Sequence, residues 1–229
     1  MNWFLKFLTS SLGQKVIMSL TGLFLVLFLV VHLAGNLQLL LDDGGEAFNV
    51  YTKKMTTSPI IKVISYGNYF FILLHAFQGI LLYFKNRKAR GSEAYAVKVT
   101  KAVNTNSFAA SNMAWLGLLI LVFLGIHMGD FWYQMKWGEV PTVVYHGDTY
   151  ENLYLKVEAS FSNIWIVLFY CLSMLGLAFH LTHGFQSAFQ SLGLNHPKYS
   201  PFIRGVGKVI GVIIPIGFAI IPLYYFFLK

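Results

Sequence analysis

The chain has 229 residues, of which 56% are hydrophobic and only 11% are charged. Soluble domains carry about 25% charged residues, so this composition excludes an ordinary water-soluble globular protein. The formal net charge of +8 is spread over the gaps between apolar segments instead of forming one patch, which argues against nucleic acid as a partner. The single cysteine, Cys171, excludes an internal disulfide and covalent cofactor attachment through a cysteine pair.

Five apolar segments are long enough to cross a lipid bilayer. They cover about residues 16–41, 63–84, 112–134, 162–189 and 209–228. A hydrocarbon core of about 30 Å needs about 20 apolar residues per helix, and lipid offers the backbone no hydrogen-bond partners. We therefore expect an all-α membrane protein with five transmembrane helices, forming one domain over residues 1–229.

Basic residues lie mainly in alternate gaps between these segments. They precede the first segment and follow the second and fourth, as Lys6, Lys15, Lys85, Arg87, Lys88, Arg90, Lys98, Lys101, Lys198, Arg204 and Lys208. The gaps after the first and third segments contain most of the acidic residues, with Lys53 and Lys54 as exceptions. By the positive-inside rule, we expect a cytoplasmic N-terminus and a C-terminus outside.

Histidines inside the apolar segments are the most informative residues of the sequence. These are His32, His75, His127, His180 and His183. An ionisable group at membrane depth is costly, so each calls either for a hydrogen-bonding partner on a neighbouring helix or for a function. The distribution favours a function, because each of the first four segments carries such a histidine and the equally apolar fifth carries none.

Residue counting places these histidines at two depths. At about 1.5 Å per residue, His32 lies about 25 Å after the basic start of its segment, and His127 lies about 22 Å into its own. Both are therefore near the outer face. His75 and His180 lie about 15 Å before the cytoplasmic ends of their segments. The depths thus predict an outer pair, His32 with His127, and an inner pair, His75 with His180.

Two imidazole pairs on alternate helices suit two noncovalent, bis-histidine haem b groups in a bundle formed by the first four helices. Zinc is the rival metal, but it usually takes three or four protein ligands at one point, often including cysteine or carboxylate. The two depths therefore favour haem. His183 lies one turn from His180, and spacing alone does not separate the two as ligands.

Small and polar residues accompany the histidines. The small ones are Ser173, Gly176, Gly184 and Ser187 near His180, Gly79 near His75, and Gly35 near His32. They suit the entry of a flat macrocycle, and they equally suit close packing of helices. Ser19, Asn36 and Gln78 are candidates for hydrogen bonds to the cofactor or to an imidazole, with a helix contact as the alternative for each.

Two short motifs resemble those of a known family. They are Ser19-x-x-Gly22 with His32 after nine intervening residues, and His180-x-x-His-Gly184 with Gly193 beyond it. They resemble the five-helix, di-haem cytochrome b subunit of succinate dehydrogenase and fumarate reductase. The resemblance covers nearly the whole chain, with one histidine on each of four helices, a basic second cytoplasmic loop and a fifth helix without a ligand.

This resemblance implies a membrane anchor in the bacterial cytoplasmic membrane. It implies a flavoprotein subunit and an iron–sulfur subunit on the cytoplasmic side, and a quinone, often menaquinone, as electron partner. It implies that His32 and His127 bind the outer haem iron, and that His75 and His180 bind the inner one. The family's fourth-helix histidine precedes glycines by four and 13 residues, which His180 matches and His183 does not.

Quinone reduction also consumes two protons, so a proton-exchanging group is expected near the quinone. Asp130, one turn outward of His127, is the candidate, and a solvated carboxylate at the end of its helix is the alternative. One rival function is a di-haem subunit of a hydrogenase or formate dehydrogenase, which commonly places two ligands on one helix or uses four helices. A cofactor-free transporter with proton-relay histidines is another, although the sequence shows no inverted repeat.

Overall fold

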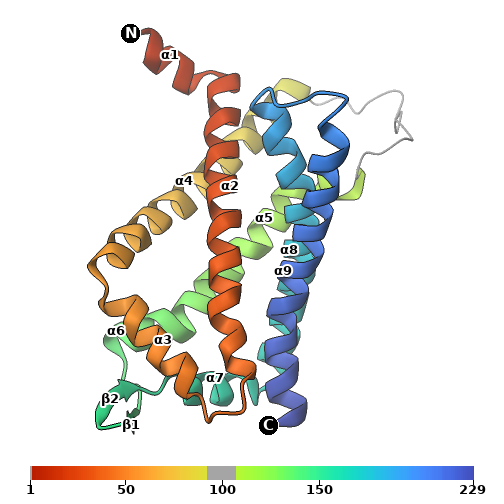
Figure 1. The fold of residues 1–229 in the computed structure, drawn as a ribbon. Coiled ribbons are helices and arrows are strands. Elements are labelled where there is room, and N and C mark those ends of the chain that lie inside the picture. Colours follow the sequence, from red (N-terminus) through yellow and green to blue (C-terminus); the bar gives the residue numbers. More distant parts are fainter. Residues whose placement is uncertain (1, 92–106) are drawn as a thin grey trace.

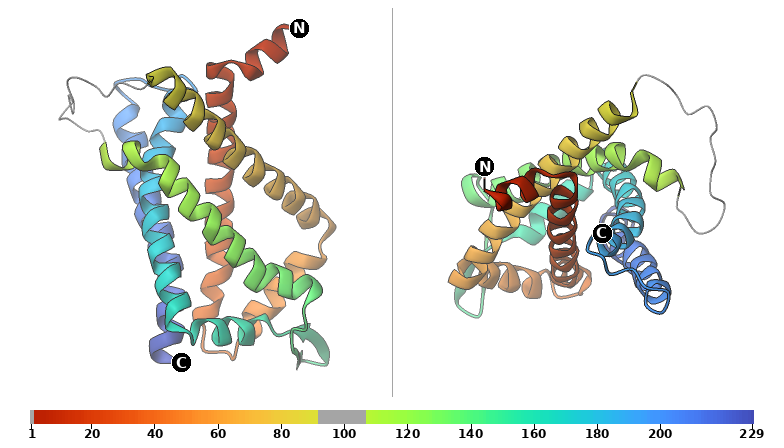
Figure 2. Two further views of the ribbon diagram at one scale, coloured as in Figure 1. Left: turned by 180° about the vertical axis from the view of Figure 1, so that it is seen from behind. Right: turned by 90° about the horizontal axis from the view of Figure 1, so that it is seen from above.

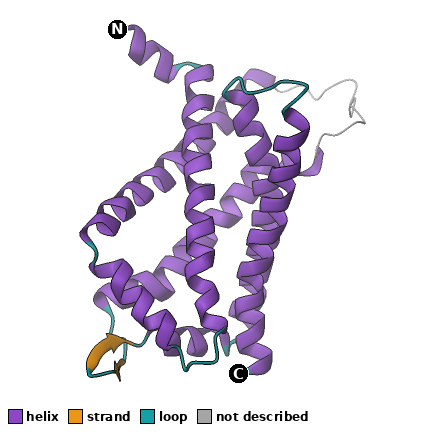
Figure 3. Cartoon of the chain, viewed as in Figure 1, coloured by secondary structure: helices purple, strands orange, loops and turns teal. Residues whose placement is uncertain are grey.

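The computed structural model describes residues 2–91 and 107–229 (Figure 1). Helices form most of this part of the chain, and a short β-hairpin lies at one end of it (Figure 3). Lys98 and Lys101 of the predicted basic loop lie outside the described residues.

The N-terminal region consists of two helices. α1 (Trp3–Thr9) leads into the long helix α2 (Ser11–Asn36), which continues as a 3₁₀ turn, η1 (Leu37–Leu40). The hydroxyl of Ser10 accepts a hydrogen bond of 3.0 Å from the backbone N–H of Gly13. This cap satisfies one of the free amides at the start of α2 and fixes the turn between the two helices.

The next two helices are separated from each other by a single residue. α3 (Glu46–Thr57) is separated from α4 (Pro59–Arg90) only by Ser58, whose backbone is extended. A residue before proline avoids the helical conformation, and proline itself suits the first turn of a helix. Ser58 and Pro59 thus end one helix and begin the next, while Gly91, at φ 74°, ends α4.

The third apolar helix changes its hydrogen-bonding pattern near its C-terminal end. α5 (Ser107–His127) passes into a π-helical stretch, η2 (Met128–Tyr133), and then into α6 (Gln134–Trp137). The change occurs directly after His127, so Asp130 lies on a π-helical turn. Such turns are rare in proteins and occur frequently at functional sites.

A β-hairpin and a short helix fill the polar segment that follows. Strands β1 (Thr142–Tyr145) and β2 (Asp148–Glu151) pair antiparallel. Their two-residue turn, His146 and Gly147, has positive φ at both positions (52° and 89°), as a type I′ hairpin turn requires. Helix α7 (Leu153–Phe161) comes next.

Two long helices complete the chain, α8 (Ile164–Ser191) and α9 (Ser200–Leu228). Among the described residues, five helices are long and apolar enough to span a membrane, namely α2 with η1, α4, α5 with η2 and α6, α8, and α9. This confirms the prediction of five apolar helices. Most are longer than predicted, because hydropathy detects only the apolar part and polar turns such as Lys85–Arg90 continue the helix.

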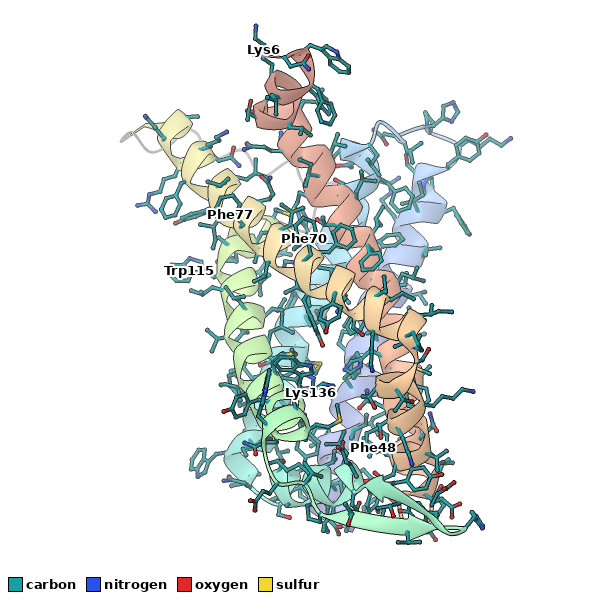
Figure 4. All side chains as sticks on the ribbon, turned by 90° about the vertical axis from the view of Figure 1, so that its left-hand side faces the viewer. Lys6, Phe48, Phe70, Phe77, Trp115 and Lys136 are labelled. Atoms are coloured by element: carbon teal, nitrogen blue, oxygen red, sulfur yellow. The ribbon has the colours of Figure 1, made fainter. Side chains whose placement is uncertain are left out.

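The long helices form a bundle in which some pairs of helices pack more closely than others. α8 and α9 make the most extensive contact, and α2 packs against both of them and against α4, while α4 and α5 run obliquely (Figure 2). Large apolar side chains such as Phe70, Phe77 and Trp115 are exposed on α4 and α5 (Figure 4). An exposed apolar surface of this extent is what a bilayer covers.

One end of the bundle carries a small polar cap built from α3, the hairpin and α7. Its centre is Asn49, which is 0% exposed. The Asn49 side chain donates to the hydroxyl of Tyr145 and to Oδ1 of Asn152, and it accepts from the backbone N–H of Tyr154, each at 3.1 Å. The segments at this end of the bundle are therefore joined to one another by one buried amide.

Candidate functional site

The structure brings the histidines of the first four long helices together in two pairs. The level nearer the start of α2 is called the inner level, and the other is called the outer level. On the inner level, the rings of His75 on α4 and His180 on α8 have centres 6.3 Å apart and planes inclined at 69°. On the outer level, the rings of His32 on α2 and His127 on α5 have centres 5.9 Å apart and planes inclined at 83°. These neighbours are the two pairs expected from residue counting.

The distance between the two levels follows independently from two helices. On α8, His180 belongs to the inner pair, and Tyr170, ten residues before it, contacts His127 of the outer pair. On α5, a side chain at Gly117 would lie 3.9 Å from His180, and His127 follows ten residues later. At a rise of about 1.5 Å per residue, each count places the levels about 15 Å apart along the bundle.

The inner pair is packed against α2. The hydroxyl of Thr21 lies 3.1 Å from Nδ1 of His75, and Thr21 is buried. Gly22 lies under the same ring, because a Cβ added there would stand 3.1 Å from Cε1 of His75. Nδ1 of His180 is a buried atom with no hydrogen-bond partner among the described residues.

The outer pair lies among aromatic side chains. Phe28 stacks on His32 with ring centres 5.2 Å apart, and Phe123 stacks on His127 at 5.5 Å. The hydroxyl of Tyr170 lies 3.3 Å from Nδ1 of His127. Each phenylalanine lies one helical turn before its histidine, on the side of the inner level. The two rings therefore form an apolar layer between the two pairs.

The contacts of His180 and His183 indicate which of them belongs to the pair with His75. His180 lies beside His75, whereas Nε2 of His183 lies 3.1 Å from the hydroxyl of Ser187, one turn along the same helix. No other histidine of the described part of the chain forms a ring contact with His183. The geometry thus pairs His180, and not His183, with His75.

The three predicted polar residues have different environments. Ser19 is buried and donates to the carbonyl of Lys15 at 2.8 Å. Asn36 donates to the carbonyl of His32 at 2.8 Å, and the same amide nitrogen lies 3.3 Å from Nδ1 of that ring. Gln78 is buried, and its Oε1 has no partner among the described residues. Asn36 therefore contacts an imidazole directly, and Gln78 is the side chain with unused hydrogen-bonding capacity.

The small residues near the histidines do not all serve the same purpose. A side chain at Gly35 would collide with Tyr51 of α3, and one at Gly176 would collide with Leu119 of α5. These two glycines permit close packing between helices. At Gly184, by contrast, an added Cβ would meet no atom within 4 Å.

Asp130 has a partner that the sequence did not indicate. Its Oδ1 lies 2.5 Å from Nζ of Lys156 on α7, and that ammonium also donates to the hydroxyl of Ser160 at 3.0 Å. Both charged side chains are partly exposed, at 23% and 28%. The segment between the third and fourth apolar segments contains Lys136 and Lys156 among its acidic residues, and nothing in the spacing of Lys156 indicated Asp130 as its partner.

The imidazole pairs fit the geometry of two axial ligands on one metal. A metal–imidazole bond is about 2.0 Å and a ring nitrogen lies about 1.1 Å from the ring centre, so two such ligands have centres about 6.2 Å apart. The observed spacings are 6.3 and 5.9 Å. Within the described ranges, no group of three or more histidine, cysteine or acidic side chains forms a metal site. Each level thus offers two imidazoles, the number of ligands that a bis-histidine haem would take.

Known proteins supply no further guide to the site. Neither a family model, nor a curated protein, nor a solved structure matches this chain.

Proposed function

We propose that this chain is the membrane-anchor cytochrome b subunit of a bacterial succinate dehydrogenase or fumarate reductase complex. It passes electrons between a partner iron–sulfur subunit and a membrane quinone through two b haems, while the dicarboxylate chemistry belongs to partner subunits. The observation that carries the proposal is the presence of two imidazole pairs, with ring centres 6.3 and 5.9 Å apart, on four long apolar helices.

Four histidines take the ligand roles in this proposal. His75 and His180 hold the inner haem, and His32 and His127 hold the outer one. Haem bound there supplies reversible one-electron oxidation and reduction. The chain holds the imidazoles in place, fixes the distance between the levels and excludes water. The stacking of Phe28 on His32 and of Phe123 on His127 supports this last role.

Asp130 is proposed to exchange protons with the quinone at the outer level. Its carboxylate stands one turn beyond His127 and is partly exposed, so it has access to both the outer site and water. Lys156 holds it by a charge-assisted hydrogen bond. A carboxylate that is positioned and hydrated at once suits proton transfer, because the acceptor must lie within hydrogen-bond reach of its source.

The end of the bundle that contains the start of α2 is proposed to face the cytoplasm. Lys85 of α4 lies at this end, and its Nζ donates to Oε1 of Gln14 on α2 at 2.8 Å. Basic residues gather here, in agreement with the positive-inside rule. The flavoprotein and iron–sulfur partners are proposed to bind this end, which is also the end nearer to His75 and His180.

Purification of the tagged chain from its native membrane tests the proposal. A dithionite-reduced-minus-oxidised spectrum should show b-type haem at two per chain, and flavin and iron–sulfur clusters should co-purify. Succinate should reduce the haem. Reduction by hydrogen or formate instead would assign the chain to another respiratory complex, and a flat difference spectrum would reject the haem proposal altogether.

A further inference from the structure

Each imidazole pair contains one ring that is held by a hydroxyl from a neighbouring helix. On the inner level this is His75 of α4, whose Nδ1 lies 3.1 Å from Oγ1 of Thr21 on α2. On the outer level it is His127 of α5, whose Nδ1 lies 3.3 Å from the hydroxyl of Tyr170 on α8. The two hydroxyls belong to different helices and to different residue types.

The hydrogen bonds of Thr21 favour one tautomer of His75. Oγ1 of Thr21 donates to the carbonyl of Ile17 at 2.8 Å, so its single hydrogen is used within α2. With its hydrogen used there, the hydroxyl is available to accept from Nδ1–H of His75. This tautomer leaves the lone pair on Nε2, which is the nitrogen that remains available for a metal.

Tyr170 is buried to nearly the same extent as Thr21. The two residues are 6% and 4% exposed, so neither hydroxyl is free to turn to water. The Tyr170 ring packs edge-on against Phe123 at 4.9 Å and against Phe161 at 5.1 Å, measured between ring centres. The phenol is thus fixed in position beside His127.

The other member of each pair lacks such a hydroxyl. Nδ1 of His180 has no hydrogen-bond partner among the described residues, and His32 is contacted by the amide of Asn36 from its own helix. The four imidazoles therefore fall into two classes, with one ring of each class on each level. The held ring is the one whose orientation and basicity the protein controls.

We propose that Thr21 and Tyr170 are positioning residues, each of which fixes one axial imidazole and sets the redox potential of one haem. This inference rests on the proposed function. A hydrogen bond from Nδ1–H makes an imidazole a stronger donor to iron and so stabilises the oxidised metal. Because the two hydroxyls lie on different levels, the potentials of the two haems are set independently.

Isosteric removal of each hydroxyl tests this inference in the purified complex. In a spectroelectrochemical titration, Thr21→Val should raise the midpoint potential of the inner haem alone, and Tyr170→Phe that of the outer haem alone. His127→Ala, which removes the outer ligand, identifies the two transitions. Thr182→Val is the matched control, because the hydroxyl of Thr182 donates to the carbonyl of Ala178 within its own helix. This variant should shift neither potential.

The outcomes separate this inference from the proposed function. If the wild-type protein contains no haem, both the proposed function and the inference are rejected. If it contains two haems whose midpoint potentials are unchanged in Thr21→Val and Tyr170→Phe, only the inference is rejected. Equal shifts of both haems in either variant reject it as well. If Thr21→Val loses haem, Thr21→Ser decides, because it keeps the hydroxyl. Retention of the wild-type potential in this variant supports the role of the hydroxyl, and loss of haem contradicts it.

Discussion

The carboxylate of Asp130 and the ammonium of Lys156 form an ion pair between the π-helical turn after His127 and helix α7. The pair ties the C-terminal end of the third long helix to the polar cap. Because both groups are partly exposed, its role in stability is modest, and its chemical role is the more informative one to test.

Asp130→Asn should impair quinone turnover and leave both haem spectra unchanged, because it removes the proton-exchanging group without touching an imidazole. Steady-state oxidation of a menaquinol analogue, measured beside the reduced-minus-oxidised spectrum, checks this. Lys156→Gln should also slow turnover, because it releases the carboxylate from its position. Unchanged turnover in Asp130→Asn would remove Asp130 from the mechanism.

Single alanine substitutions of the four paired histidines should remove haem one level at a time. We expect His75→Ala and His180→Ala to abolish the inner haem, and His32→Ala and His127→Ala the outer one. Haem per chain, determined as the pyridine haemochrome, should fall from about two to about one. His183→Ala is the control and should keep both haems. Loss of haem in His183→Ala alone would transfer the ligand role to His183.

The inclination of the imidazole planes leads to a spectroscopic prediction. The planes meet at 83° on the outer level and 69° on the inner one, so neither pair is close to parallel. Nearly perpendicular axial imidazoles give low-spin ferric haem a wider spread of g values than parallel ones. Low-temperature EPR of the oxidised protein should therefore show two strongly anisotropic signals. A rhombic signal of narrow spread would contradict the observed ring orientations.

Asn49 should make a large contribution to the stability of the outer cap. Its side chain is fully buried, and Asn49→Ala would leave the backbone N–H of Tyr154 and the Oδ1 of Asn152 without this partner. Leaving buried groups unsatisfied costs about 1–3 kcal/mol, so the unfolding midpoint in detergent should fall. Thr149→Ala, at an exposed position of the same cap, should leave the midpoint unchanged.

Gly211 should be necessary for the contact between α8 and α9. A Cβ at this position would overlap Thr182, including its backbone, which cannot move cheaply. Gly211→Ala should therefore destabilise the protein by about 1–3 kcal/mol. Gly205 on the same helix is the matched control, because an added Cβ there meets nothing within 4 Å. Gly205→Ala should be neutral or slightly stabilising, since alanine favours the helix.

The long helices and the grouping of the histidines could be predicted from the sequence. Both follow from quantities that local sequence determines: the length of an apolar segment, the rise per residue and the alternation of direction between successive spans. Their combination placed His32 at the depth of His127, and His75 at the depth of His180. Helix ends were less predictable, because the polar turns that continue α4 and α9 carry no hydropathy signal.

The contacts that hold the site could not be predicted from the sequence, for a different reason. Thr21 and His75 are 54 residues apart, and Asn49 meets Asn152 across 103 residues. Each of these contacts depends on the rotation of one helix about its axis relative to another, and periodicity fixes that angle only within a wide sector. The partner of Asp130 and the π-helical turn that carries it depend on packing in the same way.

The ten-residue separation of the imidazole levels has an electrical consequence. Two levels about 15 Å apart are separated by about half of a hydrocarbon core that is about 30 Å thick. An elementary charge that crosses the whole membrane gains or loses about 2.3 kcal/mol per 100 mV, so one that moves between the levels gains or loses about 1.1 kcal/mol per 100 mV. If the two levels carry the proposed haems, electron transfer between them is coupled to the membrane voltage, which favours one direction of turnover in an energised cell and opposes the other.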